Sequence, residues 1–304
     1  MEPKVSVIIP TYKRSQYLGR AVDSALSQSY PHVEVVVVDD NAEDAKSRGE
    51  TAALLAPYIE GGRVTLVSNE KNCGPGVSRN NGVAKCSGQY IAFLDDDDIF
   101  LENKVLGQLA YMLENELDAS FSDTRMHNAE DVLVDYREHS YVKSLDNKSL
   151  LENHIMHSLT PTSAYMYKKE VFEALGGFPD QRVGEEYMLM LNTIEAGYKI
   201  GYYAKAGVIQ YVHGGAQLSV GKRRLAAEKD MYAVKKSYFP RLTPAQRRYV
   251  RFRHHCVAAV VSLRSHMLLG MAGHAVAALV SSPLDTFKEI SGHLRRMKKY
   301  KQHQ

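Results

Sequence analysis

Buried strands and helices alternate through the first hundred residues, and this alternation constrains the fold more than any other feature. Apolar, mostly β-branched runs that are typical of buried strands occupy residues 5–9, 33–40, 63–68 and 90–94. Helical patterns lie between them at 15–28, 51–58 and after the glycines of "GPGVSRNNGVAKC". The order β-α-β-α-β-α-β predicts an α/β fold with a Rossmann-like, mostly parallel central sheet and helices on both faces.

Polar side chains follow three of these strands at the point where each strand ends. Thr11 and Tyr12 follow the first, Asp39 and Asp40 end the second, and 95–98, a run of four aspartates, follows the fourth. In sheets of this kind, ligands bind outside the carboxyl ends of the strands. We therefore expect the three clusters to converge in one crevice.

The aspartate run Asp95 to Asp98 is expected to bind a hard divalent cation. Neighbouring carboxylates repel one another unless something compensates their charge. Mg²⁺ and Mn²⁺ prefer oxygen ligands, and Mg²⁺ commonly joins one or two carboxylates to substrate phosphates. The alternative is a solvated acidic loop that also caps a helix. The position of the aspartate run at the predicted binding edge favours the metal.

Charge is unevenly distributed along the chain. Residues 222–304 hold 18 Lys and Arg against 4 Asp and Glu, whereas the rest holds 20 against 31. The basic region has helical spacing and is divided by prolines, so we expect a C-terminal helical region. It would either pack as a hairpin with a solvated basic face or contact an anionic membrane. Nucleic acid is disfavoured because no recognised motif accompanies the charge.

The sequence predicts neither a secretory signal nor a membrane span. The apolar run near the N-terminus is too short, and no uninterrupted apolar stretch approaches about 18 residues. Three cysteines without metal-ligand spacing fit a reducing compartment. We expect a cytoplasmic protein, peripheral at the inner face of the cell membrane.

The chain resembles family 2 of the glycosyltransferases, which are inverting enzymes with the GT-A fold. The matching segments run from residue 4 to about 215 and are "VSVIIPTYKR", "SALSQSYPHVEVVVVDDNAED", "NCGPGVSRNNGVAKCSGQYIAFLDDDD", "GGFPD", "GEEYMLMLNTIEAGYKI" and "HGGAQLS". Each segment alone is weak, but their order and spacing together are specific. The resemblance implies a donor-binding half at 1–125, an acceptor-binding and catalytic half at 126–221, and an appended basic helical region at 222–304.

A nucleotide-sugar donor, usually a UDP-sugar, is what the resemblance implies as substrate. Asp40 would accept from the uracil N3–H, with Asp39 beside it, and Arg79 would pair with the base or the phosphates. The alternatives are a turn or helix cap for the aspartates and a surface ion pair for the arginine. The residues assigned to the nucleotide-sugar are Pro10, Thr11, Tyr12, Asp39, Asp40, Arg79, Asp95 and Asp96.

Metal and catalytic roles follow from the same resemblance. Asp97 would be the principal ligand of Mn²⁺ or Mg²⁺, helped by Asp95, although the run leaves the choice among Asp96, Asp97 and Asp98 open. His213 is a further candidate ligand or a structural histidine.

The catalytic carboxylates come from the segment "GEEY". Glu186 stands where the family presents an aspartate base, and Glu185 matches the preceding glutamate. Both could instead simply favour the helix N-terminus. The acceptor region is predicted around "HIMHSLTPTSAYMY", with polar candidates His154, His157, Thr160 and Thr162.

The sequence thus predicts a metal-dependent inverting glycosyltransferase that builds a cell-surface polysaccharide or glycolipid on a saccharide or polyprenyl-linked acceptor. One rival is a catalytically inactive scaffold that binds nucleotide-sugar or membrane, which the glutamate at position 186 keeps open. The other is a sugar nucleotidyltransferase. It is disfavoured because "PTYKRSQYL" lacks the glycine-rich loop expected after the first strand.

Overall fold

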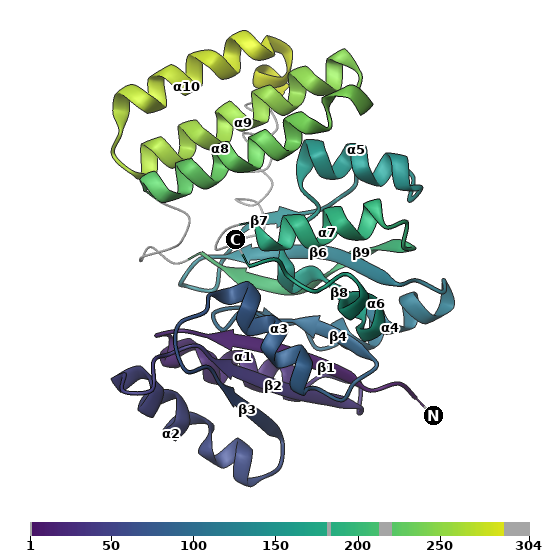
Figure 1. Ribbon diagram of the computed structural model, residues 1–304, viewed down its shortest axis with the longest axis vertical. Coiled ribbons are helices and arrows are strands. Elements are labelled where there is room, and N and C mark those ends of the chain that lie inside the picture. Colours follow the sequence, from purple (N-terminus) through teal and green to yellow (C-terminus); the bar gives the residue numbers. More distant parts are fainter. Residues whose placement is uncertain (1, 181–183, 213–220, 289–304) are drawn as a thin grey trace. The chain divides into compact units, whose positions relative to one another are not determined.

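The computed structural model describes residues 2–180, 184–212 and 221–288 (Figure 1). The strands are β1 Val5–Thr11, β2 Val33–Asp39, β3 Val64–Ser68, β4 Tyr90–Phe93, β5 Ile99–Phe100, β6 Ala119–His127, β7 Leu133–Arg137, β8 Met166–Lys168 and β9 Ile200–Tyr211. The helices are α1 Ser15–Leu26, α2 Lys46–Glu60, α3 Pro75–Lys85, α4 Lys104–Glu114, α5 Asn147–His157, α6 Lys169–Ala174, α7 Glu185–Glu195, α8 Lys222–Ser237, α9 Pro244–Arg264 and α10 Leu268–Ser281.

The chain divides into two compact units. The first contains residues 1–147 and 159–212, and the second contains 148–158 and 213–304. Most of α5 therefore belongs with the C-terminal helices, although it lies between strands of the first unit in the sequence.

One nine-stranded sheet organises the first unit, in the order β3-β2-β1-β4-β8-β6-β9-β5 with β7 paired to β6. The predicted α/β class is confirmed. The four strands predicted for the first hundred residues, β3, β2, β1 and β4, are mutually parallel as expected. Beyond β4 the sheet is mixed, because β8 runs antiparallel to both β4 and β6. The change coincides with the loss of strict strand–helix alternation in the sequence.

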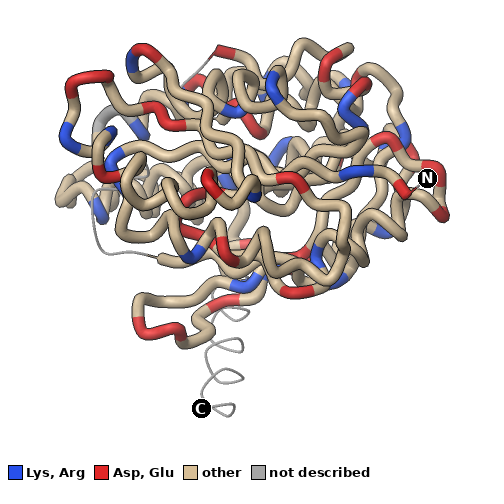
Figure 2. Tube along the Cα trace, turned by 90° about the horizontal axis from the view of Figure 1, so that it is seen from below, with Lys and Arg blue, Asp and Glu red and all other residues tan. Residues whose placement is uncertain are grey.

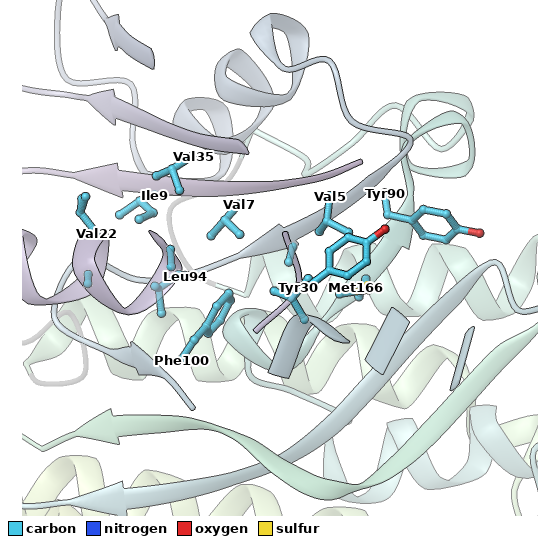
Figure 3. Close-up of a cluster of buried hydrophobic side chains, with 14 of the residues drawn as sticks. Val5, Val7, Ile9, Val22, Tyr30, Val35, Tyr90, Leu94, Phe100 and Met166 are labelled. Atoms are coloured by element: carbon cyan, nitrogen blue, oxygen red, sulfur yellow. The ribbon is translucent and has the colours of Figure 1, made fainter. Parts of the chain in front are cut away.

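Side chains of successive residues in the central strands lie on opposite faces of the sheet, and both faces are buried. Val5, Val7 and Ile9 of β1 join a buried cluster with side chains of α1, including Leu18 and Val22 (Figure 3). On the other face α3 approaches β1 and β2 closely. A Cβ at Gly82 would lie 2.6 Å from a methyl of Ile8 and 2.8 Å from one of Val38. The absence of a side chain at Gly82 is what allows this approach.

In the second unit α9 lies between α8 and α10 (Figure 1). The helix α9 begins with a capping box formed by Thr243 and Gln246. His254 of α9 lies 3.0 Å from a carboxylate oxygen of Glu228 and stacks on Tyr232, both in α8. The predicted C-terminal helical region is confirmed. Among the described residues, none of the helices has the length and apolar character needed to cross a bilayer.

Candidate active site

The carboxyl ends of β1, β2 and β3 are tied together by backbone hydrogen bonds. The Asp40 N–H donates to the Thr11 carbonyl at 2.9 Å, and the Asn69 N–H donates to the Asp39 carbonyl at 2.9 Å. Strand register therefore brings the first two predicted polar clusters side by side. Tyr12 remains 40% exposed at this edge, where its ring is accessible to a ligand.

Asp40 fixes the loop that leads into α3. One carboxylate oxygen accepts from the Cys73 N–H at 2.8 Å and from the side-chain amide of Asn69 at 2.8 Å. The other accepts from the Gly74 N–H at 3.0 Å. Gly74 has a φ of +86°, which a glycine adopts without strain. Asp40 is buried and holds the start of α3 against β2.

Asp39 is fully buried beside it. Its Oδ1 accepts from the backbone and side-chain amides of Asn41 at 2.9 and 2.7 Å, and Arg48 Nε lies 3.4 Å from Oδ2. Burial raises the pKa of Asp39, while the amides and the guanidinium oppose that shift. Asp39 and Asp40 are thus both buried and hold the loops that adjoin the ends of β1 and β2.

Asp96 and Asp97 are compensated by Thr11 at the end of β1 and by Arg14 just after it. The Thr11 hydroxyl donates to Asp96 at 2.8 Å. One nitrogen of Arg14 lies 2.6 Å from an Asp97 oxygen and 3.3 Å from an Asp96 oxygen. Burial, followed by the charge of Asp97, raises the pKa of Asp96 to about 7. The repulsion within the run is therefore relieved in part by the charge of Arg14 and in part by partial protonation of Asp96 near neutral pH.

Asp98 is directed to the strand β9. It accepts from the Tyr211 N–H at 3.1 Å and from the Gln210 side chain at 3.3 Å, and burial raises its pKa well above the ordinary value. Asp98 therefore anchors the end of β9, two residues before His213. His213 itself lies outside the described residues.

Arg79 joins the aspartate run to the start of α7. Its guanidinium lies 2.5 Å from an Asp95 oxygen and 3.2 Å from a Glu185 oxygen, and its side chain is 5% exposed. Burial alone would lower the pKa of Arg79, but the two carboxylates outweigh this and raise it. The aspartate run and the start of α7 meet through this one side chain, which is itself 106 positions before Glu185 in the sequence.

Neighbouring residues of α3 fix the geometry around Arg79. Asn80 donates its amide to the Phe178 carbonyl at 2.8 Å and accepts from the Phe178 N–H at 2.9 Å. The Arg79 guanidinium lies 5.4 Å from the centre of the Phe178 ring. A Cβ at Gly76 would lie 3.2 Å from Glu185 Cγ. The segments "VSRNNG", "GGFPD" and "GEEY" therefore form one contiguous structure.

The two glutamates of α7 have different surroundings. Glu185 is buried and occupied by Arg79, whereas Glu186 is partly exposed. Burial, followed by repulsion from Glu185, raises the pKa of Glu186 to about 7. A carboxylate that is half ionised near neutral pH is suited to accept a proton.

The aspartates differ in how far they are open to solvent. The side chains of Asp95 and Asp97 are 32% and 17% exposed, while Asp96 and Asp98 are buried. Within the described ranges no three His, Cys, Asp or Glu side chains converge to hold a metal by themselves. A Mg²⁺ or Mn²⁺ ion bound through one or two carboxylates and completed by phosphate oxygens and water fits this arrangement.

Sequence reasoning missed Arg14, Asn69 and Asn80. Arg14 lies in "PTYKR" directly after the first strand, and Asn80 follows Arg79, so both were adjacent to predicted residues. Among the acceptor candidates, His154 and Thr162 are buried, and His157 lies 3.3 Å from the Tyr249 hydroxyl in the second unit. Thr160 precedes Pro161 in the first unit.

A family comparison decides what kind of protein this is. The family model of Glycosyl transferase family 2 matches residues 6–176, more than half of the chain. The chain belongs to glycosyl transferase family 2. The predicted family and enzyme class are confirmed, and the nucleotidyltransferase alternative is set aside. The predicted assignment of individual site residues stays a prediction.

Relatives within glycosyl transferase family 2 match with moderate identity. A putative teichuronic acid biosynthesis glycosyltransferase, TuaG of Bacillus subtilis, is 34% identical over 160 residues, which are 52% of this chain and 61% of the relative. The succinoglycan biosynthesis protein ExoO of Rhizobium meliloti is 30% identical over 229 residues, 70% of this chain and 62% of the relative. The chain thus spans about three fifths of the length of these curated relatives.

Solved structures confirm the GT-A fold. TarS of S. aureus in complex with UDP-GlcNAc has a TM-score of 0.61 at 18% identity, covering 94% of this chain and 92% of that one. The mannosyltransferase PcManGT from Pyrobaculum calidifontis, in complex with GDP-Man and Mn²⁺, has a TM-score of 0.63 at 19% identity. It covers 99% of this chain and 83% of that one.

Proposed function

We propose that the chain transfers a sugar from a nucleotide-sugar, a UDP-sugar in the first instance, to a saccharide or lipid-linked saccharide with inversion at the anomeric carbon. The observation that carries the proposal is the bridge that Arg79 makes between Asp95 and Glu185. It places the aspartates that follow β4 next to the acidic start of α7. A donor diphosphate and an acceptor hydroxyl need such neighbouring carboxylate sites.

Asp97 and Asp95 are the residues that would hold Mg²⁺ or Mn²⁺, because they are the accessible members of the run. Such an ion, when bound, neutralises the charge that develops on the departing diphosphate. Asp96 supports Asp97 from the buried side through Thr11 and Arg14. Asp98 is committed to β9, so its contribution is to position the loop. His213 remains a proposed additional ligand.

Glu186 is proposed as the general base that removes the acceptor proton. Glu185 is unsuited because Arg79 already binds it in a buried ion pair. The raised pKa of Glu186 gives it basicity matched to neutral pH while leaving a substantial ionised fraction. Glu185 would then position the helix start through Arg79.

The nucleoside is proposed to lie over the ends of β1 and β2. Tyr12 offers an exposed aromatic ring, and Pro10 and Thr11 fix the strand end beneath it. The Asp39–Asp40 pair would read the base by accepting its N–H. The bound donor would contact residues 1–125, and the acceptor would contact 126–221.

The biological role is part of the proposal and is supported by the names of two relatives. TuaG and ExoO carry names from teichuronic acid and succinoglycan biosynthesis. These names support a role in cell-surface polysaccharide or glycolipid synthesis on a polyprenyl-linked acceptor. We place the protein at the inner face of the cell membrane, in peripheral contact through its C-terminal helices.

Donor hydrolysis tests the proposal directly. Purified protein is incubated with a panel of UDP-sugars and GDP-mannose in Mn²⁺, Mg²⁺ or EDTA, and released nucleotide is measured. We expect one donor to be hydrolysed, with loss of activity in EDTA and in Asp97→Ala but not in the exposed control Glu60→Ala. Binding of a nucleotide-sugar that Asp97→Ala leaves intact, with no turnover in any metal, would support the scaffold alternative instead.

A further inference from the structure

The helix α10 presents large apolar side chains to solvent. Only Ala278 of this helix is buried. The exposed fractions in and just beyond it are Leu268 64%, Leu269 92%, Val276 61%, Leu279 51%, Val280 75%, Leu284 76% and Phe287 73%. Contiguous apolar surface of this kind is unusual on a water-soluble monomer and marks an interaction site.

The side of α10 that contacts α9 is built mostly from small or polar residues. A Cβ at Gly270 would lie 3.4 Å from the Ser262 hydroxyl, and His274 lies 3.2 Å from His255. A helix that packs on its own protein usually turns its large apolar residues inward. Here the distribution is reversed, so packing on α9 does not explain the leucines and valines of α10.

The segment that contains α10 carries no charged side chain, whereas the sequence on either side of it is rich in Lys and Arg. Residues 265–284 contain no Asp, Glu, Lys or Arg. Elsewhere along the described chain, Lys and Arg are interspersed with Asp and Glu (Figure 2). Arg264 is exposed at the end of α9, and Lys288, 75% exposed after Phe287, lies 4.0 Å from an Asp285 oxygen. The sequence beyond Lys288 adds five Lys and Arg against one Glu. The apolar face of α10 therefore has cationic side chains near both of its ends.

We infer that α10, extended through Leu284 and Phe287, is a membrane-docking face that inserts into the surface of an anionic bilayer. Its 14 residues span about 21 Å, shorter than the roughly 30 Å of a hydrocarbon core, so it lies in the interface plane. Cations beside an inserted apolar helix face strengthen binding to anionic lipid. Two copies of so basic a region would repel each other, which disfavours self-association through this face.

This inference deepens the proposed function, because it names the surface that would bring the enzyme to a lipid-linked acceptor. It also assigns the membrane contact, which the sequence predicted for the basic helices in general, to one particular helix. The basic helices α8 and α9 supply electrostatic attraction at most, and the uncharged helix α10 makes the insertion. Only the purpose of the docking face, access to a lipid-linked acceptor, rests on the proposed function. Membrane binding itself is tested separately, since vesicle binding is measured without donor or metal.

Vesicle flotation with the full chain tests the docking face. Wild type is mixed with vesicles of phosphatidylglycerol and phosphatidylethanolamine or of phosphatidylcholine alone. We expect binding to the anionic vesicles and a loss of at least about tenfold in Leu269→Glu/Val280→Glu, since two apolar side chains that would enter the bilayer are replaced by charges. The matched control is Leu113→Glu, at a 47% exposed leucine of α4, which should bind as wild type does.

Additional readouts separate the possible failures. Sedimentation velocity of the same proteins should show a monomer throughout. A wild-type dimer that the double variant dissolves, without vesicle binding, would overturn the inference and assign the face to a second copy. Equal vesicle binding by wild type and the double variant would overturn it as well. Donor hydrolysis in solution should be unchanged in the double variant. If wild type binds vesicles but hydrolyses no donor, the proposed function fails and the docking face stands.

Discussion

Arg14 places a guanidinium nitrogen 2.6 Å from a carboxylate oxygen of Asp97, the aspartate proposed to bind the metal. The same nitrogen lies 3.3 Å from Asp96, so one protein cation serves two members of the run. In the absence of a divalent ion, Arg14 therefore supplies the counter-charge that the aspartates need. A metal that binds Asp97 must compete with it.

Removal of Arg14 should tighten metal binding in the absence of donor. A partly exposed ion pair is worth up to roughly 1 kcal/mol, so Arg14→Gln should bind Mn²⁺ about fivefold more tightly. Titration calorimetry or the electron paramagnetic resonance of free Mn²⁺ measures this. Arg14→Lys, which keeps the charge, should remain near wild type. Weaker Mn²⁺ binding by Arg14→Gln would mean that the arginine organises the site instead of competing for it.

The buried bridge of Arg79 should be important for stability. Arg79→Ala leaves Glu185 buried without its partner, and breaking such a pair costs about 3–5 kcal/mol of unfolding free energy. Urea denaturation measures the loss. The double variant Arg79→Met/Glu185→Met should recover much of it, because no unpaired charge is buried; Asp95 is 32% exposed and can be solvated. A double variant as unstable as Arg79→Ala would show that the loss does not arise from the charge left on Glu185.

Activity should rise with pH as Glu186 ionises. With a pKa of about 7 set by burial and by Glu185, against the opposing charge of Arg79, the base is mostly protonated at pH 6. Asp95 also adds to the repulsion. The rate of transfer under saturating donor should therefore increase through pH 7. Glu186→Gln should lose about 100-fold or more, as expected for a general base. A variant with wild-type rate would remove Glu186 from this role.

The same shift has a consequence for stability. A carboxyl group whose folded pKa lies above its ordinary value of 4.5 binds a proton more tightly in the folded state. The contribution of Glu186 to stability is then largest below pH 4.5 and is lost as pH rises to about 7. Unfolding free energies at pH 5 and pH 8 should therefore differ less in Glu186→Gln than in wild type, by on the order of 1–2 kcal/mol. Equal differences in the two proteins would contradict the shift.

Two glycines in helices should respond oppositely to alanine. A Cβ at Gly82 meets buried methyls at 2.6 and 2.8 Å, so Gly82→Ala should cost about 1–3 kcal/mol of unfolding free energy by overpacking. At Gly19 of α1 the nearest atom, on Leu54, is 3.7 Å away, so Gly19→Ala should stabilise by up to about 1 kcal/mol through helix propensity. Thermal denaturation compares the two. A stabilised Gly82→Ala would show that α3 can move away from the sheet.

The sequence by itself determined the parallel part of the sheet and the edge of the sheet at which the candidate site lies. Both follow from local pattern: short apolar, β-branched runs make buried strands, and parallel strands bring their carboxyl ends to one edge. Thr11, Asp40 and the aspartate run could therefore be assigned to one crevice from their positions after strands. The motif order likewise predicted the family before any contact was known.

Only the tertiary structure decided which of these residues are available for chemistry. Asp95 and Asp97 are accessible while Asp96 and Asp98 are buried, although all four are consecutive aspartates. Glu185 and Glu186 are likewise adjacent, yet Arg79, from 106 positions away, binds one and leaves the other with a raised pKa. Burial and ion pairing depend on residues distant in sequence, so no local pattern encodes them. The outward orientation of the α10 leucines follows for the same reason, because it depends on how α10 packs against α9.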